Sequence, residues 1–206
     1  MVTPRGAKTD ASTTTRRILE AAKRSIAASG AATLSMQDVA VDAGVSKALI
    51  HYHFHDKDTL LAKLVEHLVN GLVAREREVL AAYANQHNPL AVDALWQWVD
   101  EELHRGDIRV LLELDAYRGK AVQAAARQAA TRRREIAAET VARLFEILDL
   151  RPRVAASLLG NVVVAFLDGL AIDTALADAE SDASADRGPP RVAFDVFWLA
   201  MLSLAE

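Results

Sequence analysis

The chain has 206 residues, of which 51% are hydrophobic and 25% are charged, and its formal net charge at pH 7 is −4. This composition excludes an intrinsically disordered chain, which would carry fewer apolar residues. The sequence contains no cysteine, which excludes disulfides and thiolate metal sites. Glycine and proline are few among many alanines and leucines, so we expect an all-α fold.

Charge is distributed unevenly along the chain. Residues 1–68 hold nine Lys and Arg against seven Asp and Glu, so the net negative charge lies in the remainder. A basic N-terminal part on an acidic body suits a protein that offers one end to a polyanion. Residues 1–15 lack the apolar run of a signal peptide, and the most hydrophobic stretch, 158–172, is interrupted by Asn161 and Asp168 and is too short to span a bilayer. We therefore expect a cytoplasmic protein with no membrane partner.

The chain begins with a polar stretch, residues 1–14, which we expect to be a disordered leader. Apolar residues then recur at helical spacing from residue 15 to residue 29, and Gly30 ends this helix. Asp56 is the expected cap of a long helix with a buried stripe formed by Leu60, Leu61, Leu64, Leu68 and Leu72. Further helices are predicted at about 89–104, 107–118, 120–150, 152–178 and 191–204, with a polar linker at 180–190.

The segment 35–54, SMQDVAVDAGVSKALIHYHF, has the features of two short helices joined by a tight turn. Ser35 and Ser46 predict the N-caps of the two helices. Gly44 suits a turn that needs a positive φ, and the small side chain of Ala40 lets the helices cross closely. The pattern predicts a helix-turn-helix, a motif whose second helix can read bases in a major groove.

A small core is expected to hold the second helix of this motif rigidly. Its members are Val39, Val45, Ile50 and Phe54 from the motif, with Leu19, Ile26 and Leu34. The opposite face of the second helix then presents Lys47, Ala48, His51 and Tyr52 outwards. An ordinary helical core produces some of these spacings by chance. The position of the motif, after one N-terminal helix and before a long one, favours DNA binding over that alternative.

Residues 15–68 resemble the tetracycline-repressor (TetR) family of transcriptional regulators. The matching positions are Gly30, Ser35, Val39-Ala40, Ala43-Gly44-Val45-Ser46, His51-Tyr52-His53-Phe54, Lys57 and Leu60-Leu61. Residues 166–171, FLDGLA, are similar to the penultimate helix of family members. The resemblance implies an all-helical homodimer in which the first three helices bind double-stranded DNA. It further implies a repressor that a small-molecule effector releases from a pseudo-palindromic operator, with no cofactor.

The resemblance also implies which side chains meet DNA. Ser35 and Gln37 would contact phosphates or flanking bases, and Lys57 would hold a phosphate at the N-terminus of the fourth helix. Base edges would be approached by Lys47, Ala48 and Leu49, and phosphates or bases by His51, Tyr52 and His53. Two positions depart from the family. Histidine stands at position 51 instead of the usual tyrosine, and leucine at position 49, where threonine is frequent, either touches a thymine methyl group or packs.

Two other classes of function compete with this interpretation. His51, His53 and His55 are followed by two aspartates, which raises the hypothesis of a metal site. On a helix, residues 51 and 55 share a face while residue 53 points away, so we predict no metal site. The sequence contains no Gly-rich phosphate loop, nucleophile elbow or recognisable pair of catalytic carboxylates, so we predict no enzyme. A helical adaptor that binds only protein would differ from a repressor in failing to retain a specific duplex.

The resemblance implies that the effector binds between the middle helices, within about residues 88–150. The candidate wall residues are Trp96, Trp98, Leu103, Leu112, Tyr117 and Phe166, with Glu113, Asp115, His104 or Asn161 as polar contacts. This mixture indicates a moderately apolar ligand. Trp96 and Trp98 cannot both face the same side of a helix, so one of them is expected to be the more exposed.

The last two helices, about 152–176 and 191–204, carry too many apolar residues for one buried stripe. These are Val154, Leu158, Val162, Ala165, Phe166 and Gly169 in the first, and Val192, Val196, Trp198, Leu199 and Leu202 in the second. A helix that is apolar around most of its circumference must be covered on two sides, so we predict that a second copy pairs with these helices. Gly160, Ala165 and Gly169 would allow close backbone approach between the subunits. The alternative is a large single-chain core that uses all of this surface.

These observations together predict three parts of the chain. Residues 1–14 are the leader, residues 15–60 form a helix-turn-helix DNA-binding domain with its motif at 35–54, and residues 61–206 form an effector-binding and dimerisation domain.

Overall fold

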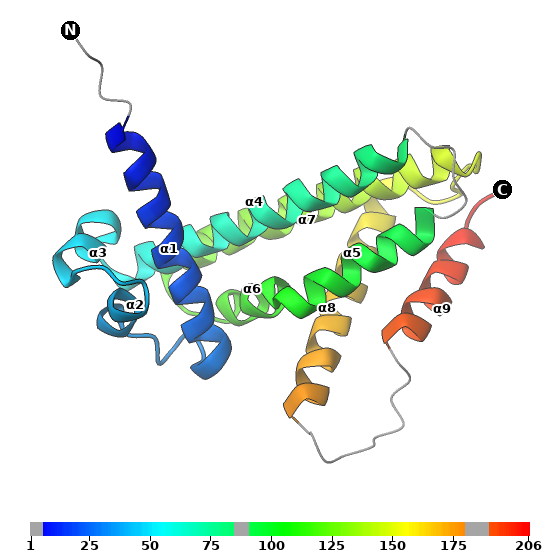
Figure 1. Cartoon of the computed structure of the whole chain (residues 1–206). Helices are drawn as coiled ribbons and strands as arrows, with labels where there is room; N and C mark the ends of the chain where they lie inside the picture. The colour runs from blue at the N-terminus through cyan, green and yellow to red at the C-terminus, as the bar shows by residue number, and fades with distance from the viewer. Residues whose placement is uncertain (1–5, 85–90, 180–189) are drawn as a thin grey trace, which may run out of the picture. The chain divides into compact units, whose positions relative to one another are not determined.

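The computed structural model describes residues 6–84, 91–179 and 190–206 (Figure 1). Within these ranges the chain forms nine α-helices, and its one extended pairing is an isolated bridge between Pro152 and Ala205. The helices are α1 Gly6–Ser29, α2 Met36–Asp42, α3 Lys47–Phe54, α4 Lys57–Ala84, α5 Ala91–Arg105, α6 Asp107–Asp115, α7 Lys120–Ile147, α8 Ala156–Ala179 and α9 Pro190–Leu202. The prediction of an all-α fold is confirmed.

Helix α1 begins at Gly6, well before the predicted start at residue 15. Residues 6–14 are therefore helical, and the prediction of a disordered leader is corrected for this part, whereas residues 1–5 lie outside the described residues. The sequence has no proline or glycine between Gly6 and Gly30. Once a helix is nucleated, each further residue adds a hydrogen bond at little entropic cost, so the predicted helix extends backwards.

The chain forms two compact units. The first joins residues up to Leu68 with Val110–Ala129, and the second joins Val69–Arg109 with Ala130–Glu206. Helices α4 and α7 each contribute to both units. The sequence predicts a single boundary after residue 60, which would leave all later residues in the second domain. In the structure, most of α6 and the start of α7 belong to the first unit together with the N-terminal helices.

The core of the first unit contains the apolar residues that the sequence predicts. The interior side chains of the predicted small core and of the α4 stripe are at most 5% exposed, namely Leu19, Ile26, Leu34, Val39, Ile50, Phe54, Leu60, Leu61, Leu64 and Leu68. Val45 is the exception, because it is only half-buried. Burying such side chains stabilises the unit by roughly 1.5–3 kcal/mol each. Helix α3 is thus held in place by Ile50 and Phe54, which pack into the core of the first unit.

A chain of aromatic rings holds α9 within the second unit. Ring centroids are 5.3 Å apart for Trp96 and Phe194, and 6.2 Å apart for Phe194 and Trp198. They are 6.3 Å apart for Trp198 and Phe197, and 4.0 Å apart for Phe197 and Phe166. These rings come from α5, α8 and α9, so aromatic contacts connect α9 to both other helices.

Helices α7 and α8 approach each other closely at Gly160. A Cβ atom at this position would lie 2.6 Å from the carbonyl oxygen of Arg134 and 2.7 Å from the backbone nitrogen of Ala138. Gly160 therefore serves a contact within one chain, which corrects the prediction that it lies between subunits. Around Gly169, in contrast, the space is open.

The second unit has an unusually polar interior. Glu102 and Asp107 are buried, and both accept hydrogen bonds from Arg75, at 2.6 Å for Glu102 Oε2 and 2.8 Å for Asp107 Oδ2. Glu76 is also buried, and its Oε1 accepts a hydrogen bond from the hydroxyl of Thr140. Burial raises the pKa of Glu76 from 4.5 to about 7, while the Thr140 hydrogen bond and the charge of Arg133 act in the opposite direction. A buried carboxyl group without a directly paired cation accounts for this shift.

Helix α8 is longer than the hydrophobic stretch that the sequence suggests. Among the described residues it is the one helix long and apolar enough to cross a bilayer, over Ala156–Leu176, with mean hydropathy 1.6. The prediction that this stretch is too short to span a bilayer is therefore corrected. Its Asp168 accepts a 2.6 Å hydrogen bond from the buried Arg133 of α7. This ion pair connects α8 to α7 in the middle of the apolar helix.

Candidate functional site

The helix-turn-helix segment is built by local hydrogen bonds. Ser35 caps α2 by accepting from the backbone N–H of Asp38 at 3.5 Å, and Ser46 caps α3 by accepting from the N–H of Leu49 at 3.2 Å. Gly44 in the turn has φ +63°, a left-handed conformation that favours glycine. The predicted caps and the predicted turn glycine are thus confirmed.

Arg17 of α1 also holds this turn, which sequence reasoning missed. Its guanidinium donates a 2.5 Å hydrogen bond to the carbonyl oxygen of Ala43. A Cβ at Gly44 would lie 2.9 Å from Arg17 Nη2, so glycine also leaves room for this side chain. The adjacent arginines 16 and 17 were visible in the sequence, but the partner of Arg17 lies 26 residues away along the chain.

The outer face of α3 is exposed. Tyr52 is 78% exposed and Leu49 is 36% exposed, and Lys47, Ala48 and His51 are exposed as well. On the opposite face Ile50 and Phe54 are fully buried. The exposed side chains therefore project from a helix whose position is set by packing. Their contact with DNA stays a prediction.

The other residues expected to contact DNA differ from one another in exposure and in their hydrogen-bond partners. Gln37 is exposed on α2, whereas Ser35 is half-buried because its hydroxyl serves as the cap. His53 is half-buried, and its Nδ1 lies 3.3 Å from the hydroxyl of Thr15. His51 Nδ1 lies 3.1 Å from the carbonyl oxygen of His55.

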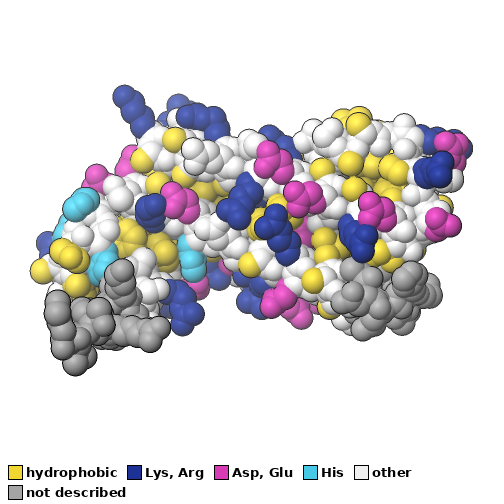
Figure 2. Space-filling model, turned by 90° about the horizontal axis from the view of Figure 1, so that it is seen from above, with side chains coloured by type: hydrophobic (Ala, Val, Ile, Leu, Met, Phe, Trp, Pro, Cys, Tyr) yellow, Lys and Arg dark blue, Asp and Glu magenta, His cyan; other side chains and the backbone are white. Residues whose placement is uncertain are grey.

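The histidines do not converge on a common point. Figure 2 shows histidine side chains at the left of the view, on the part of the molecule that carries α3. The described residues contain no group of three or more His, Asp or Glu side chains that could hold a metal ion. His51 and His53 instead contact other parts of the first unit, as given above.

Lys57, at the first position of α4, is held by two neighbours. Its Nζ donates a 2.8 Å hydrogen bond to the carbonyl oxygen of Ala32 and lies 5.6 Å from the centre of the Tyr117 ring. Burial lowers the pKa of Lys57, and the charge of Asp58 opposes this effect. Asp56 caps the same helix by accepting from the N–H of Thr59 at 2.7 Å, and this hydrogen bond lowers the pKa of Asp56. The N-terminus of α4 thus holds an ordered ammonium group, Lys57, between the carboxylates of Asp56 and Asp58.

The residues that the resemblance assigns to an effector pocket are divided between the two units. Leu112, Glu113 and Tyr117 belong to the first unit, and Trp96, Trp98, Leu103, Asn161 and Phe166 to the second. Trp98 is buried and Trp96 is half-buried, so Trp96 is the more exposed of the pair.

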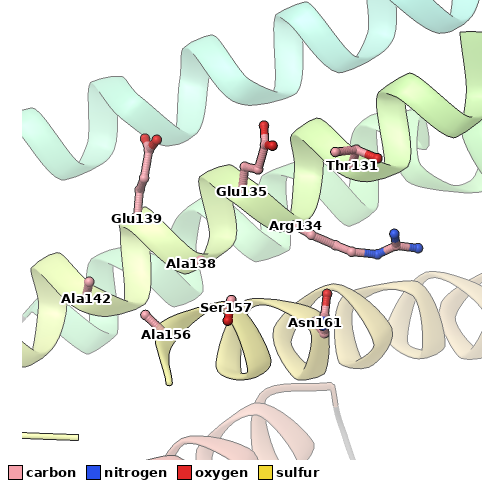
Figure 3. Close-up of a pocket in the computed structure, with 9 residues that line it drawn as sticks. All are labelled: Thr131, Arg134, Glu135, Ala138, Glu139, Ala142, Ala156, Ser157 and Asn161. Carbon is pink, nitrogen blue, oxygen red and sulfur yellow. The ribbon is translucent and has the colours of Figure 1, made fainter. Parts of the chain in front are cut away.

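An open cavity of about 520 Å³ lies between α7 and α8 (Figure 3). Its lining consists of Thr131, Arg134, Glu135, Ala138, Glu139, Ala142, Ala156, Ser157 and Asn161. Of the predicted effector residues, Asn161 lines it. In Figure 3, Glu135 and Glu139 point away from α8, Arg134 extends along the space between the two helices, and Asn161 points from α8 into this space.

Helices α8 and α9 leave many large apolar side chains exposed. Leu199 is 68% exposed, Val196 62% and Val162 43%. The others are Leu158, Ile172, Leu176 and Val192. Trp198, which the sequence placed among the interface residues, is only 6% exposed and belongs to the aromatic core instead. The remaining apolar surface has no cover within the part of the chain that the structure describes.

A family model matches the N-terminal part of the chain. The family model for bacterial regulatory proteins of the tetR family matches residues 18–64, which contain α2, α3 and the start of α4. A curated relative, the HTH-type transcriptional regulator BetI of Agrobacterium fabrum, is 34% identical over 74 residues. That alignment covers 36% of this chain and 34% of BetI, so the chain matches about a third of the length of this relative.

Solved structures with a similar fold cover nearly the whole chain. A transcriptional regulator from Rhodococcus has a TM-score of 0.70 at 23% identity, covering 93% of this chain and 97% of its own. A TetR transcription regulator from Haloarcula marismortui has a TM-score of 0.71 at 20% identity, covering 95% and 100%. The SmeT–triclosan complex has a TM-score of 0.66 at 16% identity, covering 91% of each chain. At these identities the likeness concerns the fold.

Proposed function

We propose that the chain is a sequence-specific transcriptional repressor of the tetR family of bacterial regulatory proteins, whose model matches residues 18–64. The observation that carries the proposal is the outer face of α3. This face projects Lys47, Leu49 and Tyr52 into solvent while Ile50 and Phe54 anchor the helix from below. A rigid helix with exposed polar and cationic side chains can lie in a major groove and contact base edges.

The DNA-binding domain in this proposal is residues 15–60, and the flanking contacts come from residues near helix N-termini. The ammonium of Lys57 at the start of α4 favours a phosphate, and Ser35 and Gln37 lie at the start of α2. Ser35, Gln37, Lys57 and His53 would fix the register of the protein on the duplex. Lys47, Ala48, Leu49, His51 and Tyr52 would contact the bases or adjacent phosphates.

We propose that the repressor acts as a homodimer in the cytoplasm. The exposed apolar side chains of α8 and α9 form a face that a second copy would cover, in a four-helix arrangement. Gly169, around which the space is open, would allow the backbones of two α8 helices to approach. The two DNA-binding domains of the dimer would then contact a pseudo-palindrome with half-sites about one helical turn or somewhat more apart.

The remaining element of the proposal is a small-molecule effector that releases the operator. The neighbour SmeT has been solved in complex with triclosan, and NalD is described as the secondary repressor of a multidrug efflux pump in Pseudomonas aeruginosa. In this chain, Trp98 and Trp198 each bury an indole N–H that has no hydrogen-bond partner within the described structure. Such donors in an otherwise apolar interior suit a moderately apolar ligand that carries a hydrogen-bond acceptor.

Selection of bound duplexes from genomic DNA, followed by a binding titration, tests the function. We expect the selected duplexes to share a pseudo-palindrome and to bind at least a thousandfold more tightly than random duplexes. Equal affinity for selected and random duplexes would contradict the proposal.

Two lysine variants then test the assigned roles. Lys57→Ala should weaken binding to all duplexes alike and reduce the salt dependence by about 0.9 units of slope for each phosphate that the protein no longer neutralises. Lys47→Ala should instead change the preferred bases in the half-site. A changed base preference in Lys57→Ala with an unchanged salt slope would show that the two roles are assigned wrongly.

A further inference from the structure

Residues 110–119, which belong to the first unit, contact its N-terminal helices at positions next to the expected DNA contacts. The resemblance assigns Glu113 and Tyr117 of this segment to an effector pocket, but the structure gives both side chains partners among the N-terminal helices. These partners are the α1–α2 turn and the N-terminus of α4, which carries Lys57.

Glu113 holds the turn between α1 and α2. Its Oε1 accepts a 3.1 Å hydrogen bond from the backbone N–H of Ala31. Gly30, with φ +84°, lets the backbone pass close to this carboxylate, because a Cβ there would lie 3.2 Å from Glu113 Oε1. The turn leads directly into Ser35, the N-cap of α2. A carboxylate bonded to a turn N–H therefore fixes the start of the helix-turn-helix.

Tyr117 holds Lys57 from another side. An ammonium group has three N–H donors, and in Lys57 one of them is used by the carbonyl oxygen of Ala32 at 2.8 Å. The Tyr117 ring faces the same ammonium at 5.6 Å, a cation–π contact. The Tyr117 hydroxyl donates to Asp58, which keeps the ring in place. Gly119 permits this approach, since a Cβ there would lie 2.5 Å from the carboxylate oxygens of Asp58.

We propose that Glu113 and Tyr117 are positioning residues for DNA binding: Tyr117 orients the Lys57 ammonium towards a phosphate, and Glu113 fixes the turn that precedes Ser35 and Gln37. This inference rests on the proposed function. Ordering a long lysine side chain on binding costs conformational entropy, and contacts that order it in the free protein remove that cost from the binding step. Neither residue touches DNA in this scheme.

A double-mutant cycle tests the role of Tyr117 with the selected operator as the probe. Tyr117→Leu should weaken binding roughly tenfold, because no aromatic ring then faces Lys57 in either subunit of the dimer, and should keep the salt slope of wild type because Lys57 still neutralises its phosphate. Tyr117→Phe keeps the ring and should restore most of the affinity. In the Lys57→Ala background, Tyr117→Leu should have no further effect, since Tyr117 acts through Lys57. Additive losses of affinity in the double variant would overturn this part.

For the Glu113 variants, the expected change in operator affinity is opposite in sign to the change that charge repulsion alone would give. Removing a carboxylate from a DNA-binding unit should strengthen binding to a polyanion, as we expect for the matched control Asp115→Ala, an exposed carboxylate at the end of the same helix. Glu113→Ala should instead weaken operator binding roughly fivefold to tenfold, and Glu113→Gln, which keeps an acceptor for Ala31, should restore it. Binding by Glu113→Ala as tight as that of Asp115→Ala would overturn this part.

Wild-type protein distinguishes the two levels of proposal. If wild type shows no preference for any selected duplex, the proposed function itself fails. If wild type binds its operator and both Glu113→Ala and Tyr117→Leu bind equally well, only the positioning role fails. Circular dichroism melting of each variant separates a loss of positioning from a loss of folding. Because Glu113 is exposed, its substitution tests the proposal without disturbing the packing of the core.

Discussion

Replacing Glu76 by glutamine should make the stability of the protein less sensitive to pH. Glu76 is 6% exposed, and burial raises its pKa from 4.5 to about 7. The folded state therefore binds this proton more tightly than the unfolded state. Below about pH 4.5 the carboxyl group is protonated in both states and costs nothing. Between pH 4.5 and 7 stability falls as pH rises, and above pH 7 the full cost is present.

The size of the effect follows from the pKa shift. At 1.36 kcal/mol per pKa unit, the rise to about 7 corresponds to roughly 3 kcal/mol of lost stability at pH 8. Glutamine keeps an oxygen acceptor for the Thr140 hydroxyl and carries no charge, so it removes this cost. We expect Glu76→Gln to match wild type at pH 4 and to exceed it by up to about 3 kcal/mol at pH 8.

Urea unfolding at fixed protein concentration, followed by tryptophan fluorescence at pH 4, 6 and 8, measures this difference. The tryptophans at positions 96, 98 and 198 all lie in the second unit, as does Glu76, so the signal reports on the right part of the chain. Glu78→Gln, an exposed glutamate on the same helix, is the control and should show no such trend. A constant difference between Glu76→Gln and wild type at all three pH values would refute the reasoning, as would destabilisation at pH 8.

Two further predictions concern α8 and α9. Val162→Asp and Leu199→Asp, each placing a charge on the exposed apolar face, should give folded monomers by size-exclusion with light scattering and should bind the full operator poorly; persistent dimers would contradict the interface. Gly160→Ala should destabilise the protein by about 1–3 kcal/mol in urea unfolding, because its Cβ would meet the carbonyl oxygen of Arg134 at 2.6 Å. Gly169→Ala, in open space, is the control and should cost less than about 1 kcal/mol or stabilise the helix slightly; equal losses at both glycines would argue against the close α7–α8 approach.

The sequence by itself determined the local construction of the helix-turn-helix. The capping serines, the turn glycine and the alternation of buried and exposed residues on α3 all act within a few residues of one another. Local hydrogen bonds and helical periodicity therefore predict them without knowledge of the rest of the chain. The excess of apolar residues on the last two helices was visible for the same reason. Their exposure on the folded chain, for example 68% at Leu199, agrees with that excess.

Only the tertiary structure decided the roles of residues whose partners are far away in sequence. Glu113 is 82 residues from Ala31, and Glu76 is 64 residues from Thr140. Gly160 lies in a helical stretch of sequence, yet the position must lack a side chain because the backbone of α7 lies too close for a Cβ atom. Neither composition nor periodicity carries information about such pairs, because the helix that supplies the partner is chosen by packing. A carboxylate that looks like a ligand contact in the sequence therefore becomes, once α6 folds back onto α1, the acceptor for a turn that precedes the proposed DNA-binding face.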